Sequence, residues 1–376
     1  MVRFLHTADL QLGMPLEWVP DDRGALLRER RLEAIDRLIA AAVDGNADFI
    51  LIAGDLFDAN TLEDRVIVQA CCRLAKTDLP ILAIPGNHDH GGPASIYARE
   101  SFTASRPENL SILDDPRPEP ILDDRVLILP APLMHRSAGG DPTRHMTSEL
   151  GRDVAPDAIR IGLAHGSIVG FGHSEADSID PERARKAELD YLALGDWHGM
   201  KKIDERTWYS GTPEPTSFKD NEPGYGLLVE ITSHGSSPST QPKLIGQTRW
   251  LRHQAELHGP ADIDRLESWF EEIDSPLHVL VRLQLEGVLG LEDQERVEKL
   301  CSHWDHRLIH LRLRGPGIAT HASDRELDIV ASDGYVRAAV ERLRDLSDKR
   351  STRSKQAADA LRLLYRLKVR QGGEGC

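Results

Sequence analysis

The sequence has few cysteines and no long apolar run, and each absence excludes a class of protein. Its 376 residues include four cysteines, too few for the disulfide framework of a small secreted protein. No apolar run approaches the ~20 residues that span a membrane. The N-terminus also turns polar too early for a signal peptide. We therefore expect a protein of the reducing cytoplasm that has no membrane partner.

Several familiar catalytic motifs are also missing. The chain has no Walker A sequence of a P-loop nucleotide-binding protein and no His-Glu-x-x-His of a zinc protease. The segment around His173 and Ser174 superficially matches a hydrolase nucleophile elbow, but it lacks the last glycine and no strand is predicted before it. There is also no internal repeat. The functional residues must be sought outside these patterns.

Charge is distributed unevenly along the chain. The formal net charge is -15, with 40% apolar and 28% charged residues, which is the balance of a globular protein. The segment from residue 341 to residue 376 contains ten Lys and Arg against five Asp and Glu. It therefore carries a net charge of +5, and the rest of the chain carries -20. A basic tail on an acidic body predicts different partners for the two ends.

The first part of the chain alternates strands and helices in the order of an α/β fold. Apolar runs at 2–5, 49–53 and 81–84 predict buried strands, and amphipathic stretches near 24–44 and 62–76 predict the helices between them. Further strands are expected at 126–129, 161–164, 191–194, 207–209, 226–231 and 244–250, with a polar turn over 233–242. We expect the later strands to form a second, more antiparallel sheet.

The pattern of helices and strands starts again near residue 255, which indicates separate parts. We predict a first domain over residues 1–252 and a small α/β domain over residues 253–330. A C-terminal helical segment is expected over residues 331–376, with a polar hinge near 347–354.

Five of the predicted buried strands are each followed by side chains that can bind metal ions. Ligand sites of open α/β sheets form beyond the carboxyl ends of the strands, and residues two apart in an extended segment project to the same side. Glycines beside four of the five sites allow tight turns and close backbone approach. We therefore expect one cavity to collect Asp9, Gln11, Asp55, Asn87, His165, Asp196 and His198.

The chemistry of this set predicts two divalent ions. It combines three carboxylates, two imidazoles and two amides with no thiolate, which suits Mn²⁺ or Fe²⁺ better than a structural zinc site. Seven ligands are too many for one six-coordinate ion that also holds water. Two ions ~3.5–4 Å apart that share a carboxylate are a common device for hydrolysing phosphoesters. We expect two such ions, with Mn²⁺ preferred.

The order of these motifs resembles that of the calcineurin-like metallophosphoesterases, which is Asp-x-His, Gly-Asp-x-x-Asp, Gly-Asn-His-Asp, His and Gly-His-x-His. Within that superfamily the chain is similar to the SbcD-type DNA-repair exonucleases. The similarity lies in the segments 6–10, 53–58 and 208–218. It covers roughly residues 1–250 and implies a metallophosphoesterase sandwich of two mixed β-sheets flanked by helices. A small α/β cap domain that helps to position DNA and C-terminal helices would follow.

The resemblance also implies a role for each candidate residue. Asp9, Gln11, Asp55 and His198 would hold one ion. Asp55, Asn87, His165 and Asp196 would hold the other, with Asp55 bridging the two. A hydroxide formed between the ions would attack phosphorus. His88 would donate a proton to the leaving oxygen or stabilise the transition state. Asp89 would orient His88, and Asp58 would orient a ligand.

Two positions depart from the family pattern. Gln11 stands where the family usually has His, and Asp196 stands where the first His of Gly-His-x-His is usual. An amide oxygen is a weaker ligand than imidazole, and a third carboxylate leaves a net charge of +1 instead of +2 beside two divalent ions. Attraction for a phosphodiester should therefore be weaker, and the preference should shift towards harder metals such as Mn²⁺.

The resemblance implies three partners. DNA would be the substrate, an SbcC-like ATPase would bind the helix expected at 355–370, and a second copy of the chain would form a homodimer. The alternative for that helix is packing against this protein's own body. Six basic residues either contact DNA phosphates or form an ordinary solvated face. They are Lys201, Lys202, Arg206, Lys219, Arg136 and Arg144. His6 is expected to be structural, and His90, His135, His145 and His173 to lie in surface loops.

The leading hypothesis is a dimetal-dependent DNA phosphodiesterase that acts as an exonuclease in DNA repair with the ATPase, with endonuclease activity left open. Two alternatives remain open. The acidic body favours a metallophosphoesterase that acts on a small phosphodiester, a nucleotide or a phosphoprotein. The departures at Gln11 and Asp196 favour a catalytically weakened scaffold subunit of a DNA-repair complex.

Overall fold

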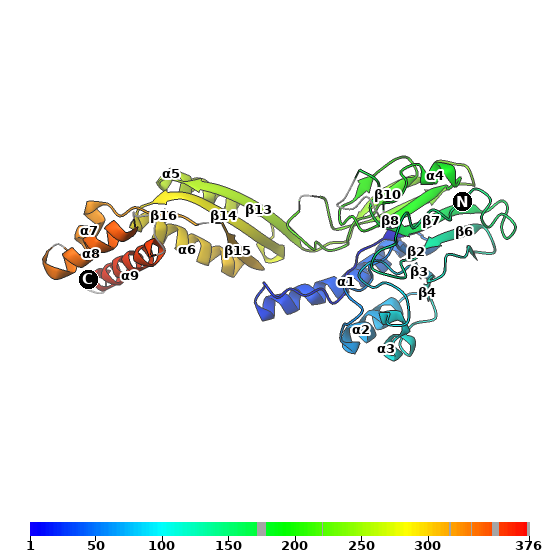
Figure 1. The fold of residues 1–376 in the computed structure, drawn as a ribbon, viewed down its shortest axis with the longest axis horizontal. Helices are drawn as coiled ribbons and strands as arrows, with labels where there is room; N and C mark the ends of the chain where they lie inside the picture. The colour runs from blue at the N-terminus through cyan, green and yellow to red at the C-terminus, as the bar shows by residue number, and fades with distance from the viewer. Residues whose placement is uncertain (171–177, 220, 316, 332, 348–352, 374–376) are drawn as a thin grey trace. The chain divides into compact units, whose positions relative to one another are not determined.

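The computed structural model describes the chain except residues 171–177, 220, 316, 332, 348–352 and 374–376 (Figure 1). The chain divides into two compact units, Met1–Thr248 and Arg249–Cys376. His173 and most of the hinge expected near 347–354 lie outside the described residues. Within the described residues, no helix is both long enough and apolar enough to cross a membrane.

The first unit contains two six-stranded sheets. The first sheet has the order β12-β11-β1-β2-β3-β4 and the second has the order β5-β6-β7-β8-β10-β9. The strands are β1 (Val2–Thr7), β2 (Phe49–Ile52), β3 (Ile81–Ala83), β4 (Leu110–Ile112), β5 (Glu119–Ile121), β6 (Val126–Ala131), β7 (Ile159–His165), β8 (Tyr191–Gly195), β9 (Lys201–Lys202), β10 (Thr207–Tyr209), β11 (Tyr225–Ile231) and β12 (Ser239–Leu244). Both sheets mix parallel and antiparallel pairs, which confirms the expected sandwich of mixed sheets.

The buried strands carry apolar residues on both faces. One face of each sheet packs against the other sheet, and the opposite face packs against helices. Successive side chains of a strand point to opposite faces, so Phe4 packs between the two sheets while Leu5 faces outward. The ring of Phe4 stacks on Phe49 of the same sheet with centroids 5.1 Å apart. It also meets the edge of Tyr191 in the other sheet at 5.4 Å. The core between the sheets is therefore continuous.

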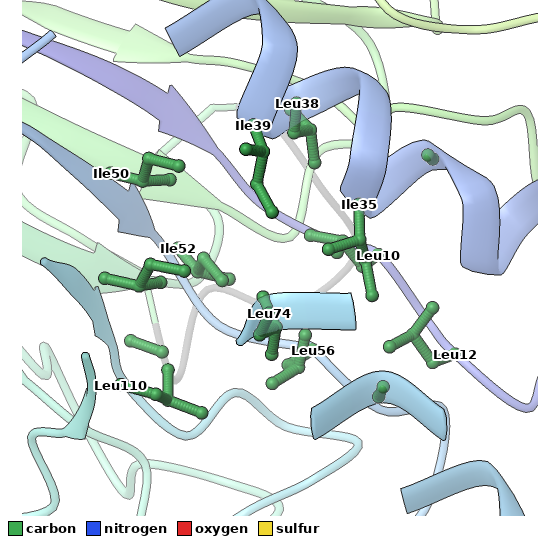
Figure 2. Close-up of a cluster of buried hydrophobic side chains, with 14 of the residues drawn as sticks. Leu10, Leu12, Ile35, Leu38, Ile39, Ile50, Ile52, Leu56, Leu74 and Leu110 are labelled. Carbon is green, nitrogen blue, oxygen red and sulfur yellow. The ribbon is translucent and has the colours of Figure 1, made fainter. Parts of the chain in front are cut away.

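Helices cover the outer face of the first sheet. Figure 2 shows the cluster that α1 (Asp21–Asp44) and α2 (Asp64–Leu74) form with the strands, including Ile35, Ile50 and Leu74. A short 3-10 helix η1 (Ile96–Ala98) and α3 (Glu100–Thr103) follow β3. On the second sheet, α4 (Arg183–Lys186) contributes Ala184 to a separate outer cluster. The layer order is helix, sheet, sheet, helix.

Two expectations about the later strands are wrong. The second sheet is mainly parallel, because β6, β7, β8 and β10 pair in parallel and only its edge strands β5 and β9 are antiparallel. The strands β11 and β12 join the first sheet, where β11 pairs antiparallel with β1. The strand β12 lies largely within the segment expected to be a polar turn. It is a polar edge strand that contains Pro242, so its sequence carries no apolar pattern.

The second unit begins with a parallel sheet of β13 (Arg249–Leu257), β14 (Val279–Leu289) and β15 (His310–Arg314). A short strand β16 (Ala319–Thr320) also pairs with β14. The helices α5 (Pro260–Glu271) and α6 (Leu291–Arg307) connect the long strands, with a 3-10 turn η2 (Pro276–His278) before β14. Apolar residues of both helices pack on the sheet in one core.

Three helices end the chain, α7 (Asp324–Val330), α8 (Gly334–Ser347) and α9 (Ser354–Gly373). They share a small apolar cluster that buries Leu361 and Tyr365 of α9. Some apolar side chains of this last helix are thus buried within the chain, while Leu363 and Leu367 remain exposed. Arg366 pairs with Glu298 of α6. These contacts correspond to the alternative in which the helix packs against this protein itself.

Candidate metal centre

The loops after β1 and β2 run side by side and carry Asp9 and Asp55. The backbone N–H of Asp9 donates to the carbonyl of Gly54 (3.1 Å), and that of Gln11 donates to the carbonyl of Asp55 (2.9 Å). Asp9, Gln11 and Asp55 have φ angles of 53°, 44° and 53°, a region that residues other than glycine rarely adopt. Asp196 also has a positive φ, of 96°. Strained backbone of this kind gathers at functional sites.

Two glycines allow the candidate ligands to approach one another. Gly54 has a φ of 87°, and a Cβ at this position would lie 2.4 Å from Nδ1 of His165. A Cβ on Gly86 would lie 2.2 Å from Oδ1 of Asp55. Real Cβ atoms do not come this close to other heavy atoms, so a side chain at either position would displace a candidate ligand.

Asp9, Asp55 and His165 form the centre of the site. One ligand atom from each lies within 4.8 Å of those of the other two, and all three side chains are buried. Nε2 of His165 lies 3.6 Å from Oδ1 of Asp55 and 3.1 Å from Oδ1 of Asn87. Nδ1 of His165 donates to the carbonyl of Ala53 at 2.8 Å. This bond fixes the ring so that Nε2 faces the carboxylates.

A second group of candidate ligands shares Asp9 with the first. Nε2 of His198 lies 3.8 Å from Oδ1 of Asp9 and 3.3 Å from Nε2 of Gln11. Nδ1 of His198 is hydrogen-bonded to Oγ1 of Thr216 at 2.5 Å. Gln11 is buried despite its polar amide. The structure thus brings Gln11 and His198 together beside Asp9.

Asp196 lies at the edge of the central cluster. Its backbone N–H donates to both carboxylate oxygens of Asp9, at 3.2 and 3.1 Å. Its own Oδ2 accepts a hydrogen bond from Oγ of Ser167 at 2.6 Å. In the described part of the chain, the tight group of acidic and histidine ligand atoms contains Asp9, Asp55 and His165 without Asp196. The main chain of Asp196 is therefore tied to the cluster, while its side chain is held by Ser167.

His88 stands over the cluster with its side chain 38% exposed. Its backbone N–H donates to Oδ1 of Asp55 at 2.9 Å, and its Nδ1 donates to the backbone carbonyl of Asp58 at 2.9 Å. The carboxylate of Asp58 lies 4.0 Å from the same nitrogen. Asp58 was expected to orient a metal ligand, but its contacts are with His88.

Asp89 is buried and makes three hydrogen bonds, two of them to the loops that carry candidate ligands. Its carboxylate accepts hydrogen bonds from the N–H of Gly86 (2.7 Å), the N–H of Phe57 (3.0 Å) and the hydroxyl of Tyr97 (2.5 Å). These bonds join the loops after β2 and β3, which carry Asp55 and Asn87. Burial raises the pKa of Asp89 to about 6, and the charge of Asp55 adds to this. Asp89 is therefore a positioning residue.

The electrostatics of the site suit a cation. Burial raises the pKa of Asp9 well above its usual value. Burial disfavours the charged form of His165, but the carboxylates of Asp55, Asp9 and Asp196 outweigh it and raise the pKa of this imidazole to about 9. Burial lowers the pKa of His198 to about 4, which keeps that ring neutral. The oxygen and imidazole donors of Asp9, Asp55, Asn87 and His165 fit a divalent ion of the Mn²⁺ type.

Several residues that support the site were not predicted from the sequence. Thr216 and Ser167 contact His198 and Asp196, and Tyr97 holds Asp89. The hydroxyl of Thr212 donates to the carbonyl of Asp9 at 2.7 Å. Arg31 is buried and donates to the carbonyl of Leu10 at 3.0 Å. Thr212 and Thr216 lie in the segment 208–218 that carries the family resemblance. That resemblance is the only sequence feature that could have pointed to these two residues.

The remaining histidines that the sequence analysis named lie outside this cluster. His90 and His145 contact backbone carbonyls and His135 is exposed. His6 is fully buried, and its Nδ1 is hydrogen-bonded to the hydroxyl of Tyr191 at 3.0 Å.

Three of the six basic residues that the sequence analysis named have contacts within the protein. Arg206 pairs with Asp190 at 3.2 Å and donates to the carbonyl of Leu189, so its guanidinium has a structural role. The ammonium groups of Lys201 and Lys202 lie over the rings of Trp197 and Trp208, at 5.2 and 5.5 Å from the centroids. Lys219, Arg136 and Arg144 are exposed.

Comparison with known proteins gives a consistent picture. The family model of the calcineurin-like phosphoesterases matches residues 2–200. The chain is 26% identical to the DNA double-strand break repair protein Mre11 of Methanosarcina acetivorans, over 77% of this chain and 45% of that protein. It is 27% identical to the metallophosphoesterase YhaO of Bacillus subtilis, over 76% of this chain and 71% of that one. It is 24% identical to a component of the SbcCD nuclease of Escherichia coli K12, over 65% of this chain and 70% of that one. The match thus covers less than half the length of the Methanosarcina protein.

Proposed function

Because the chain belongs to the calcineurin-like phosphoesterase family, we propose that it is a metal-dependent DNA phosphodiesterase that acts as an exonuclease in DNA repair. The observation that carries this proposal is the buried group of Asp9, Asp55 and His165, whose ligand atoms converge within 4.8 Å. Support for DNA as the substrate comes from relatives that are named as a DNA double-strand break repair protein and as part of a nuclease.

In the proposed reaction the chain's own residues hold and orient the reacting groups. One divalent ion would be held by Asp9, Gln11, Asp55 and His198. The second would be held by Asp55, Asn87, His165 and Asp196, so Asp55 would be shared by both. When bound, two such ions lower the pKa of water towards neutrality and stabilise negative charge on a phosphoryl group. The rigid backbone contacts of Asp9 and Asp55 fix the carboxylates before the substrate arrives.

His88 is the residue that we assign to proton transfer. Its Nδ1 donates to the carbonyl of Asp58, which leaves Nε2 as the atom that exchanges a proton with the leaving oxygen. The ring is partly exposed, and the backbone N–H of His88 donates to Oδ1 of Asp55. The carboxylate of Asp89 accepts hydrogen bonds from the N–H groups of Gly86 and Phe57. These bonds fix the loops that carry Asn87 and Asp55.

We further propose Mn²⁺ as the metal, the cytoplasm as the compartment and an SbcC-like ATPase as the partner. The oxygen-rich ligand set supports Mn²⁺, and the free thiols of Cys71, Cys72 and Cys301 suit a reducing compartment. Leu363 and Leu367 on α9 are exposed, and they are the apolar side chains that a partner would cover. The cap role of the small α/β domain, residues 253–330, and homodimer formation are predictions from the family resemblance.

The test is a DNA cleavage assay in Mn²⁺ that compares wild type with Asp55→Ala and His88→Ala. We expect both variants to lose at least about a hundredfold in rate, because a general acid alone contributes roughly this much. His258→Ala, an exposed histidine in the second unit, is the matched control and should cleave like wild type.

Equal activity of wild type and both variants would contradict the proposal. Turnover of a small chromogenic diester without DNA cleavage would favour a small phosphodiester or a nucleotide as substrate. Binding of fewer than one Mn²⁺ per chain at saturation would favour a scaffold role.

A further inference from the structure

Residues 211–216, which follow strand β10, lie against the backbone of the loop that carries His198. The N–H of Thr212 donates to the carbonyl of His198 at 3.1 Å. Gly211 has a φ of 75°, and a Cβ at this position would lie 2.7 Å from the carbonyl carbon of Gly199. Only a glycine permits this conformation and this close approach. The two segments are therefore in direct backbone contact, and we call residues 211–216 the strap.

The strap also contacts the loop after β1. The hydroxyl of Thr212 donates to the carbonyl of Asp9 at 2.7 Å. Arg31 of α1 is buried, and its guanidinium donates to the carbonyl of Leu10 at 3.0 Å and to the carbonyl of Pro215 at 2.6 Å. A guanidinium presents its donors in a fixed planar fork, which the ammonium group of a lysine does not reproduce. Arg31 thus fixes the strap against the loop after β1.

A buried carboxylate anchors the strap from another side. Oε1 of Glu214 accepts a hydrogen bond from the N–H of Gln247 at 2.8 Å, and Oε2 accepts one from the hydroxyl of Thr248 at 2.6 Å. Glu214 also pairs with Arg37 at 2.5 Å. Burial lowers the pKa of Arg31 to about 10, and the charge of Glu214 opposes this shift. The guanidinium therefore stays charged at neutral pH, and the strap is held in place on both sides.

Thr216 is the point at which the strap meets a candidate metal ligand. Its Oγ1 lies 2.5 Å from Nδ1 of His198. On the other edge of the same ring, Nε2 lies 3.3 Å from Nε2 of Gln11. An amide nitrogen can only donate, so Nε2 of His198 must accept the hydrogen bond from Gln11. The ring proton is then on Nδ1, which donates to the hydroxyl oxygen of Thr216.

This tautomer is the one that a metal ligand needs. An imidazole binds a divalent ion through an unprotonated nitrogen, and the hydrogen bond of the other nitrogen decides which one that is. We propose that Thr216, held in place by Arg31, is a positioning residue that fixes His198 in the tautomer and orientation in which Nε2 can hold the ion beside Gln11. This inference rests on the proposed function for the metal, and it assigns a role to two side chains that hold no metal themselves.

The role is specific to one of the two proposed ions. His198 belongs to the ion beside Gln11. The other ion is held in part by His165, whose ring has an orienting bond of its own, from Nδ1 to the carbonyl of Ala53 at 2.8 Å. Loss of the Thr216 hydroxyl should therefore weaken one site and leave the other unchanged. A general loosening of the fold would weaken both.

The first experiment determines the tautomer of His198 in the metal-free protein. NMR spectra are recorded in EDTA at neutral pH on full chains with isotope-labelled histidine nitrogens, and the His198 signals are assigned by their loss in His198→Gln. We expect the proton on Nδ1 in wild type and in Thr216→Ser. Thr216→Val should show a mixture of both tautomers, because the acceptor of the Nδ1 proton is lost. A proton on Nε2 in wild type, or an unchanged tautomer in Thr216→Val, would overturn the inference.

The second experiment measures both Mn²⁺ affinities of the full chain by electron paramagnetic resonance. Thr216→Val should weaken the site beside Gln11 by at least about tenfold, because losing a contact that orients a ligand typically costs about 10–100-fold in metal affinity. Thr216→Ser keeps the hydroxyl and should bind both ions like wild type. Arg31→Lys keeps the charge but loses the fork, so it should show a smaller loss at the same site. The site of His165 should be unchanged in all three variants.

The matched controls are Thr240→Val, at a half-buried threonine of β12, and Arg28→Lys, at an exposed arginine of α1. Both should bind like wild type, and Thr216→Val should melt close to wild type because valine has the shape of threonine. Undiminished affinity in Thr216→Val, equal losses at both sites, or failure of Thr216→Ser to keep the affinity would each overturn the inference. Failure of wild type to bind a second Mn²⁺ would instead contradict the proposed pair of ions, and the tautomer would then test the inference alone.

Discussion

Gln11 supplies a neutral amide at the point where His198 comes within 3.8 Å of Asp9. An amide oxygen binds a divalent ion more weakly than an imidazole nitrogen, so the ion beside Gln11 and His198 should be held less tightly than the ion beside Asp55, Asn87 and His165. The substitution Gln11→His should therefore raise the affinity of the weaker site by about tenfold. A Mn²⁺ titration followed by electron paramagnetic resonance measures both affinities.

The matched control for this change is Gln241→His, on the exposed edge strand β12. It should leave both Mn²⁺ affinities unchanged. Two sites of equal affinity in wild type, or no gain in Gln11→His, would show that Gln11 does not limit the second site.

Gly86 is required by the position of Asp55. A Cβ at this residue would lie 2.2 Å from Oδ1 of Asp55, so Gly86→Ala must push the carboxylate or the loop that carries Asn87. We expect Mn²⁺ affinity to fall at least about tenfold, because losing the contacts that orient a ligand typically costs 10–100-fold in metal affinity. Isothermal titration calorimetry measures the loss. Gly259→Ala, at a glycine with open space around its Cβ position, is the control. Equal affinity in Gly86→Ala would contradict the geometry.

The pKa of His165 predicts a pH dependence of metal uptake. In the metal-free protein the carboxylates of Asp55, Asp9 and Asp196 outweigh burial and raise the pKa of His165 to about 9. An ion must displace that proton, so below pH 9 binding is weaker at lower pH and releases protons. Calorimetry in buffers of different ionisation heat should detect proton release on binding at pH 7, and Mn²⁺ affinity should rise from pH 6 to pH 8. A pH-independent affinity would contradict this account.

The convergence of Asp9, Asp55 and His165 could be predicted from the sequence because each lies at the end of a buried strand. Asp9, Asp55 and His165 come directly after apolar runs, and the carboxyl ends of parallel strands meet at one edge. The partners of these ligands could not be predicted. Tyr97 lies eight residues from Asp89, and Thr216 lies eighteen from His198. No local pattern marks a hydroxyl that the fold brings to a ring nitrogen or a carboxylate.

Among the elements, β1 contains a buried group that makes the fold sensitive to acid. His6 is fully buried, and burial lowers its pKa to about 3 from a usual value of 6.5. The unfolded chain therefore binds a proton at His6 between pH 6.5 and 3 that the folded chain does not bind. The free energy of unfolding must fall as the pH decreases through this range.

We expect His6→Gln to reduce this loss. Between pH 7 and pH 5 the His6 contribution amounts to about 2 kcal/mol, from ~1.4 kcal/mol per pH unit below the unfolded pKa. Urea unfolding of wild type and His6→Gln at both pH values measures the difference, and His258→Gln is the exposed control. The same pH dependence in wild type and His6→Gln would contradict the assignment.

The strands also show which elements can be predicted. The strands β1, β2 and β3 are apolar and central, and their sequences indicate them directly. The edge strand β12 is polar and contains Pro242, so its sequence resembles that of a turn. The placement of β11 beside β1 depends on a pairing between residues more than two hundred positions apart. Sequence patterns contain no information on such long-range register.

For the whole molecule, the structure places every candidate metal ligand in the unit Met1–Thr248. A fragment of residues 1–248 should therefore bind Mn²⁺ with the same affinity as the full chain, within about twofold. Calorimetry on the purified fragment measures this affinity. A tenfold loss of Mn²⁺ affinity in a folded fragment would show that the second unit completes the metal centre.

The central claim of this account is that side chains from five strand ends surround divalent ions. The most direct measurement is an anomalous-scattering map of a crystal soaked in Mn²⁺. We predict a strong peak within bonding distance of Asp55, Asn87 and His165, and a weaker one beside Asp9, Gln11 and His198. A map with Mn²⁺ peaks elsewhere, and none beside Asp55 and His165, would contradict the account.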